Sequence, residues 1–208
     1  MHAAAEEDDP VLDEITAAGA GGVEWTLRLH GDSIRVTDGA QTFTHTRDEI
    51  ASASAIYLAR RGAHVSLPGW KRSLRFSAFD LATLRQWMGP ALAEWGRAET
   101  SREGLLSSLI GIAVLTLWMY YDVWAFFAFG ELTLATWIGR RFAPGRWIHL
   151  ASAGRTLVTM GVTVAEVAAE QVAVWWLLIA LSLIGYLVDD LRRYRFFAPL
   201  SSPAEVLD

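Results

Sequence analysis

Cysteine is absent from the 208 residues of this chain, which excludes disulfide bonds, thiolate metal sites and cysteine nucleophiles. Lysine is nearly absent, because Lys71 is the single lysine among eighteen basic residues, a preference typical of GC-rich bacterial genomes. Common catalytic patterns are missing too: there is no GxSxG, P-loop or HExxH motif, and no carboxylate pair in a catalytic context. We therefore expect a protein that is not an enzyme and holds no cofactor or metal.

Basic residues are missing from the start of the chain. Residues 1–22 carry six acidic side chains and no lysine or arginine, and they end in an Ala/Gly-rich stretch. This composition predicts a disordered acidic tail and linker. Because no basic segment is followed by an apolar one here, we expect no signal peptide.

Two long apolar runs dominate the second half of the chain. Residues 171–188 contain no charge, and residues 105–129 contain only Asp122. A membrane span needs about 20 mostly apolar residues, and both runs carry Trp and Tyr side chains towards their ends. The pattern predicts a transmembrane region over 104–191, with spans at about 105–129 and 170–189.

The segment between the runs leaves the number of spans open. Residues 147–165 are moderately apolar but include His149 and Arg155. A central arginine costs about 2.5–3.5 kcal/mol on the insertion scale. This segment is therefore predicted to be an interfacial helix or a weak extra span, giving two or three spans in all.

Arginines on both sides of the runs predict the orientation. Basic residues mark the cytoplasmic side of a membrane, and they occur before the first run and in the tail 192–208. We therefore expect a bacterial inner-membrane protein whose N-terminal domain and C-terminus are cytoplasmic.

Residues 23–76 follow a different pattern, in which apolar and polar residues alternate with a period of two. Asp38-Gly39 is a strong hairpin signal within this stretch. Short strands at hairpin spacing predict an antiparallel sheet or small barrel. Ser77 with Asp80 resembles a capping box and predicts that a helix begins there, and Gly89-Pro90 should split it.

Three stretches carry a resemblance to a known family: WTLRLHGDSIRVTDG, DEIASASAIYLARRGAHVSLP and WKRSLRFSAFDLATLRQWM. In this order they resemble the bacterial pleckstrin-homology-like (PH-like) domains, including the YcxB-like group, over roughly residues 23–95, within a predicted domain of residues 23–97. The resemblance implies a cytoplasmic sheet capped by one helix and used for binding or scaffolding. The expected fold class is thus an α+β membrane protein, a PH-like domain followed by transmembrane helices.

Several polar residues are candidate functional groups. His149 would ligate a pigment, haem or metal, or is simply an interfacial polar residue. Asp122 is a functional candidate if it lies within the membrane, and an ordinary solvent-exposed residue if it lies at the interface. Glu166 and Glu170 are one helical turn apart and would hold a cation or a partner's arginine, or form the solvated start of a helix.

A basic set in the sheet domain would contact anionic lipid headgroups, at about 1 kcal/mol per charge near such a surface. Its members are Arg60, Arg61, Lys71, Arg72 and Arg75. The alternative is an ordinary charged sheet face. Because the set is small and the chain is acidic overall, we expect no nucleic-acid binding.

These observations predict a non-catalytic accessory subunit, scaffold or assembly factor of a larger bacterial membrane complex, with membrane lipids and other membrane protein subunits as partners. Two alternatives stay open. One is an anionic-lipid-binding module. The other is a small membrane enzyme or transporter, which requires Asp122, His149, Arg155, Glu166 and Glu170 to face one polar cavity.

Overall fold

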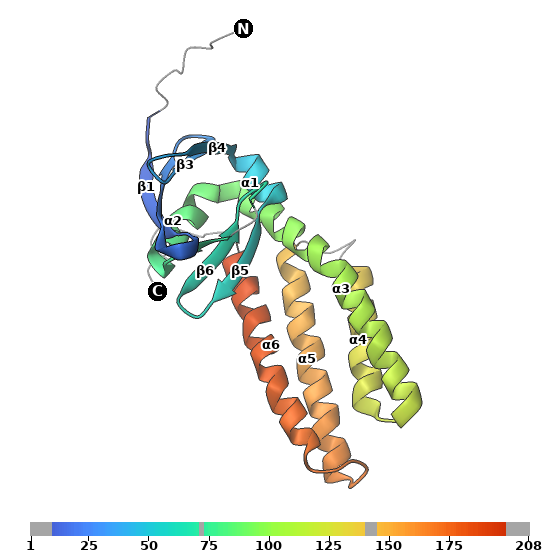
Figure 1. The fold of residues 1–208 in the computed structure, drawn as a ribbon. Coiled ribbons are helices and arrows are strands. Elements are labelled where there is room, and N and C mark those ends of the chain that lie inside the picture. The colour runs from blue at the N-terminus through green and yellow to red at the C-terminus, as the bar shows by residue number, and fades with distance from the viewer. Residues whose placement is uncertain (1–9, 71–72, 140–144, 199–208) are drawn as a thin grey trace. The chain divides into compact units, whose positions relative to one another are not determined.

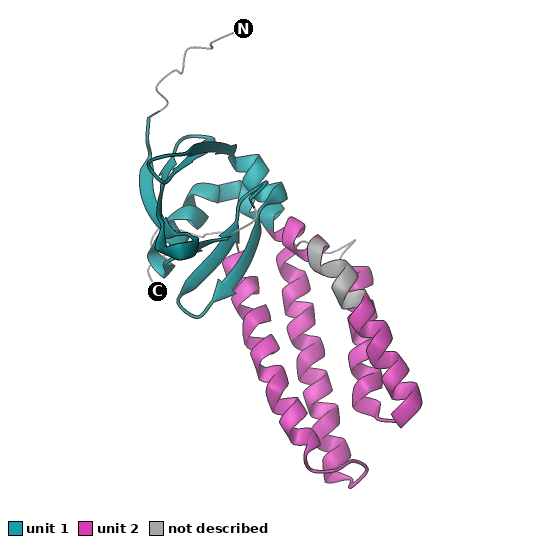
Figure 2. Ribbon diagram, in the orientation of Figure 1, with its two compact units in different colours: residues 1–95, 199–208 teal, residues 96–198 magenta. Residues whose placement is uncertain are grey.

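The computed structural model describes residues 10–70, 73–139 and 145–198, without the side chains of residues 102–108. The fold is α+β (Figure 1). The chain forms two compact units, residues 1–95 with 199–208 and residues 96–198 (Figure 2). The first contains the strands and is called the sheet unit, and the second is called the helical unit.

Seven antiparallel strands form a single curled sheet in the order β4-β3-β2-β1-β7-β6-β5 (Figure 1). The strands are β1 (Asp13–Ala18), β2 (Glu24–Leu29), β3 (Ser33–Thr37), β4 (Thr42–Thr46), β5 (Ala55–Ala59), β6 (Gly62–Ser66) and β7 (Leu74–Phe76). A short 3-10 helix, η1 (Ala20–Gly22), connects β1 to β2.

The alternation in the sequence explains which face of the sheet forms the core. Leu27 and Leu29 of β2 are buried, and so are Ile34 and Val36 of β3, whereas the residues between them are more exposed. Burying each such side chain contributes about 1.5–3 kcal/mol. The alternation is therefore confirmed as strand for β2 and β3.

The first strand was not expected, because residues 1–22 were predicted to be tail and linker. Instead β1 lies inside the sheet and pairs with β2 on one side and β7 on the other. Ile15 and Ala17 of β1 are buried, while Glu14 on the opposite face forms a 2.9 Å ion pair with Arg28. Two buried positions were too weak a pattern to overcome the acidic composition around them. The rest of that prediction for residues 1–9 lies outside the described residues.

A short helix also interrupts the stretch 23–76, over which the alternation predicted only strands. Helix α1 (Arg47–Ala53) begins after Thr46, whose side chain accepts a hydrogen bond from the Glu49 amide, while the Glu49 side chain accepts one from the Thr46 amide. This reciprocal capping box satisfies two donors that a helix start leaves open. Strand β5 then begins at Ala55.

The helix predicted to follow the last strand is confirmed. Ser77 caps α2 (Ala78–Met88) by accepting a hydrogen bond from the Asp80 amide, and Leu81, Leu84 and Met88 form its buried face. The expected split at Gly89-Pro90 is present as well. Gly89 has a φ of 49°, and the 3-10 helix η2 (Gly89–Ala91) separates α2 from the next helix.

Four helices follow: α3 (Leu92–Tyr121), α4 (Trp124–Gly139), α5 (Gly145–Ala168) and α6 (Trp176–Phe196). Helix α5 packs between α4 and α6 (Figure 1). Helices α3 and α4 approach closely at Gly130 of α4. A Cβ atom at this position would collide with Leu115 of α3. The absence of that atom lets the two backbones meet.

The apolar run 105–129 does not form one helix. Helix α3 ends at Tyr121, Asp122 adopts a left-handed backbone with a φ of 51°, and α4 begins at Trp124. The charge that interrupts the run therefore marks a turn between two packed helices.

The run 171–188 is also broken at its start. Glu170 has a φ of 57°, and α6 begins only at Trp176. The apolar part of α6, residues 176–188, is about 20 Å long at 1.5 Å per residue, against a hydrocarbon core of about 30 Å. Beyond it, Asp189, Asp190 and Arg193 continue the same helix.

Within the described part of the chain, no helix combines the apolar character with the length that crossing a membrane requires. The predicted fold class with two or three spans in residues 104–191 is therefore wrong, as is the inner-membrane placement that depended on it. The segment 147–165 does form a helix as part of α5, and one face of α5 is buried against its neighbours. Whether its other face lies at a membrane interface stays a prediction.

Candidate functional site

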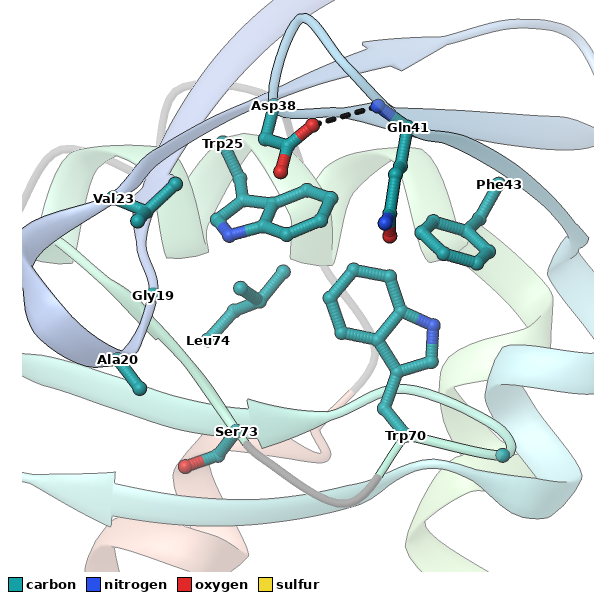
Figure 3. Close-up of a pocket in the computed structure, with 11 residues that line it drawn as sticks. Gly19, Ala20, Val23, Trp25, Asp38, Gln41, Phe43, Trp70, Ser73 and Leu74 are labelled. Carbon is teal, nitrogen blue, oxygen red and sulfur yellow. Dashed lines mark hydrogen bonds between the residues drawn. The ribbon is translucent and has the colours of Figure 1, made fainter.

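An aromatic pocket in the sheet unit is the leading candidate for a functional site (Figure 3). Its volume is about 400 Å³, within the range of small-molecule and side-chain sites. Aromatic and small residues line it, together with one carboxylate: Gly19, Ala20, Val23, Trp25, Asp38, Gln41, Phe43, Gly69, Trp70, Ser73 and Leu74.

Three aromatic rings form one wall of this pocket. The ring centroid of Trp70 lies 4.8 Å from that of Trp25 and 5.0 Å from that of Phe43, and both pairs are edge-to-face. Such pairs contribute about 0.5–1.5 kcal/mol beyond the area they bury. These contacts hold the three rings against one another. The rings remain partly exposed, with Phe43 at 38%, so the cluster is open to a ligand.

The sheet topology brings these rings together from separate elements. Trp25 is the second residue of β2, Phe43 lies on the edge strand β4, and Trp70 follows β6. Gly19 permits the arrangement, because a Cβ atom there would lie 2.5 Å from Nε1 of Trp25. The glycine in the Ala/Gly-rich stretch thus has a packing role beside the pocket.

Asp38 supplies a fixed negative charge at the rim. Its Oδ1 accepts a hydrogen bond from the backbone amide of Gln41, at 2.8 Å (Figure 3). It accepts a second one from the backbone amide of Ala40, at 2.9 Å. These bonds, that from Gln41 first, hold the pKa of Asp38 below its ordinary value. The carboxylate is therefore ionised at neutral pH beside the aromatic wall.

The described residues of the lining do not supply an acid-base or nucleophilic pair. Asp38 is the one ionisable side chain among the described residues that line the pocket, and its Oδ1 accepts the two amide hydrogen bonds of the turn. Nor does the described part of the chain contain a cluster of three or more potential metal ligands. The chemistry of the pocket suits binding by aromatic faces and one charge.

The predicted basic set is only partly described. Arg60 and Arg61 lie in the turn between β5 and β6, and Arg75 is exposed on β7, while Lys71 and Arg72 lie outside the described residues. The register pairs Ala63 with Phe76, which places the β5–β6 turn near the far end of β7. Binding of anionic headgroups by this set remains a prediction.

The predicted polar residues of the second half separate into two groups. His149 and Arg155 of α5 line a common cavity in the helical unit. Asp122, Glu166 and Glu170 lie elsewhere: Asp122 and Glu170 form turns, and Glu166 accepts hydrogen bonds from the first amides of α4. The membrane enzyme or transporter hypothesis required all five to converge, and the geometry contradicts that requirement.

His149 is fully buried, so the alternative of an interfacial polar residue does not describe its surroundings. Its ring stacks on Phe197 with centroids 6.0 Å apart. Ligation of a pigment, haem or metal by His149 remains a prediction.

Comparisons with family models, curated proteins and solved structures give no match. The resemblance of the sheet unit to PH-like domains therefore remains a prediction.

Sequence reasoning did not identify the aromatic pocket. Trp25 looked like one more member of an alternating strand, and Phe43 and Trp70 looked like members of two other strands. The available signal was that each ring lies near a strand end or a Gly turn, where one rim of a curled sheet can gather them.

Proposed function

We propose that this protein is a non-catalytic scaffold or accessory subunit of a larger assembly, and that its sheet unit holds a segment of a partner protein in the aromatic pocket. The observation that carries the proposal is the preformed wall of Trp25, Phe43 and Trp70 beside the ionised Asp38. Tryptophan is among the residue types most enriched at the energetic centres of interfaces.

The chemistry of the pocket specifies the partner segment. An apolar or aromatic side chain would contribute about 1.5–3 kcal/mol by burial, with a further gain from edge-to-face contact. A lysine or arginine beside it would meet both the Asp38 carboxylate and the ring faces, and a cation–π contact contributes about 0.5–2 kcal/mol. We infer a segment in which an aromatic residue adjoins a basic one.

The surface of the helical unit supports a scaffold role. Large apolar side chains remain exposed on its helices, including Met119 and Tyr120 at 79% and Leu178 at 68%. Exposed apolar side chains in such number are typical of surfaces that other proteins cover. Helices of a partner subunit with complementary apolar faces are the occupants we propose.

The resemblance to PH-like domains adds support, because such domains are used for binding and scaffolding. Seven antiparallel strands followed by α2 are consistent with that resemblance.

Selection from a random peptide display library on the full chain tests the proposal. We expect enriched peptides to share an aromatic residue next to a lysine or arginine, and to be lost when Trp70→Ala is the target. Phe79→Ala is the matched control, because Phe79 is an aromatic residue of α2, 69% exposed, that does not line the pocket. Peptides that bind Trp70→Ala as well as the unaltered protein would overturn the proposal.

A further inference from the structure

Strand β4 forms one edge of the sheet beside the aromatic pocket. It pairs with β3 on one side and is the last strand of the sheet order on the other. All of its residues except His45 are exposed. Its sequence, TFTHT, contains no lysine, proline or carboxylate, which are residues that commonly protect an edge strand from pairing with another chain. This edge can therefore accept a further strand.

The pairing of β3 with β4 shows which backbone groups of β4 point away from the sheet. The Arg47 amide donates to the Asp32 carbonyl at 2.8 Å, and the Asp38 amide donates to the Gln41 carbonyl at 3.3 Å. In an antiparallel ladder, pairs that exchange hydrogen bonds alternate with pairs that do not. The odd-numbered residues of β4 therefore bond to β3, and the even-numbered residues do not.

The even-numbered residues of β4 direct their backbone groups outward. Thr46 agrees with this direction, because its amide donates to the Glu49 side chain and not to β3. Thr42 and Thr44 each direct one N–H and one C=O to the same side, and these four groups have no hydrogen-bond partner among the described residues. They offer two donors and two acceptors at the spacing of a β-strand.

The side chains of β4 connect this edge with the pocket. Phe43 lies opposite Val36, and residues that are directly opposite in a sheet share one face. Because Val36 is buried in the core, the Phe43 ring lies on the core face of the sheet. Trp25 lies on the same face, since its partner in β1, Ala17, is also buried. The aromatic wall of the pocket thus adjoins the free edge of β4.

A strand added antiparallel to β4 would place one side chain against this wall. Phe43 bonds to β3, so the residue opposite it on the added strand forms a pair without hydrogen bonds, with Cα atoms about 4.5 Å apart. The side chain of that residue lies next to the Phe43 ring, whose centroid is 5.0 Å from that of Trp70 (Figure 3). The residues before and after it bond to the backbone of Thr42 and Thr44.

We propose that the partner segment binds as an additional antiparallel strand on β4, with its aromatic or apolar residue, the anchor, opposite Phe43. Two observations specify this occupant. The outward groups of Thr42 and Thr44 match an extended backbone, and the adjoining rings of Phe43 and Trp70 match an apolar side chain. The inference rests on the proposed function and adds the conformation and register of the segment.

A proline at Thr44 tests the proposal. Thr44→Pro removes an outward N–H and leaves the hydrogen bonds to β3 in place. Thr44→Ala is the matched control, because it keeps this N–H. The best peptide selected on the full chain is titrated into both variants by calorimetry. We expect the dissociation constant to rise at least about tenfold in Thr44→Pro and less than about threefold in Thr44→Ala, and equal dissociation constants would overturn the proposal.

The Trp70→Ala variant distinguishes this inference from the proposed function. Peptides that bind Thr44→Pro normally and are lost in Trp70→Ala would overturn the added strand and leave the pocket proposal standing. Peptides that are lost in Thr44→Pro and retained by Trp70→Ala would overturn the pocket proposal and leave the pairing with β4 standing. A library that yields no binding peptide would overturn both.

A scan of the peptide with the unaltered chain covers the case in which Thr44→Pro fails to fold. Each peptide of the scan carries one N-methylated backbone amide. N-methylation of the residue before or after the anchor removes a donor that faces β4, and it should weaken binding at least about tenfold. N-methylation of the anchor, whose amide points away from β4, should change the dissociation constant less than about threefold. Equal effects at the three positions would contradict the added strand.

Discussion

The carboxylate of Glu166 accepts a hydrogen bond from the backbone amide of Trp124, with the two heavy atoms 2.6 Å apart. The other carboxylate oxygen accepts from the amide of Ala125, at 3.1 Å. These amides belong to the start of α4, where no intrahelical acceptor exists. A buried side chain of α5 therefore caps α4 and fixes the α3–α4 turn.

Replacing Glu166 should destabilise the helical unit. We expect Glu166→Ala to cost about 2 kcal/mol, because it leaves two amides without acceptors, and Glu166→Gln about 1 kcal/mol, because its amide oxygen still accepts one bond. Hydrogen exchange at the Trp124 and Ala125 amides measures the effect locally and should become faster. Glu170→Gln, four residues further on, should change neither quantity, and unchanged exchange in Glu166→Ala would refute the capping role.

The turn at Asp122 leads to a second prediction, which concerns the stability of variants at this position. A φ of 51° suits glycine, is tolerated by asparagine and aspartate, and is strained for β-branched residues. We expect Asp122→Gly and Asp122→Asn to change the free energy of unfolding by less than about 1 kcal/mol. Asp122→Val should cost about 1–2 kcal/mol more. Urea denaturation measures all three, and a valine variant as stable as the glycine variant would show that the chain does not turn here.

Asp38 should make the sheet unit sensitive to acid. Its pKa in the folded protein is lowered by the backbone hydrogen bonds from Gln41 and Ala40, so the folded state favours the carboxylate. The stability that it contributes is fully present above the ordinary value of 3.8 and is lost as the pH falls through the lower folded value. Asp38→Asn lacks this contribution. Urea midpoints of the two proteins should differ most at neutral pH and converge in acid, and a constant difference would contradict the assignment.

The sequence predicted the individual strands and the helix of the sheet unit better than the pairing of the strands. The alternation around Leu27 and Val36 predicted strands, and the capping signal at Ser77 predicted the start of α2. Both signals depend only on residues that are close in the chain. The pairing of β1 with β7 joins residues almost sixty positions apart, Ala17 and Phe76, and no local pattern encodes it. Thr46 and Glu49 have the spacing of a capping box, but the apolar residues that follow them are equally typical of a strand.

Hydrophobicity alone does not predict the helical unit, because it does not show where the chain turns. Glycine and proline are the usual signals of a break, and neither occurs at Asp122 or Glu170, which both adopt positive φ. The runs therefore looked continuous. His149 and Arg155 were identified as unusual polar residues, but their cavity required Asp189, Asp190 and Arg193 of α6, which had appeared only as the flank of a span.

The central claim is that the aromatic pocket binds a partner segment through Trp70 and Asp38. Calorimetric titration of the best selected peptide into the full chain tests it most directly. We expect Trp70→Ala to raise the dissociation constant about 30-fold, as for a hot-spot residue contributing about 2 kcal/mol, and Phe79→Ala to leave it unchanged. Asp38→Asn should weaken binding only when the peptide retains its basic residue, as a double-mutant cycle would show. An unchanged dissociation constant in Trp70→Ala would contradict the account.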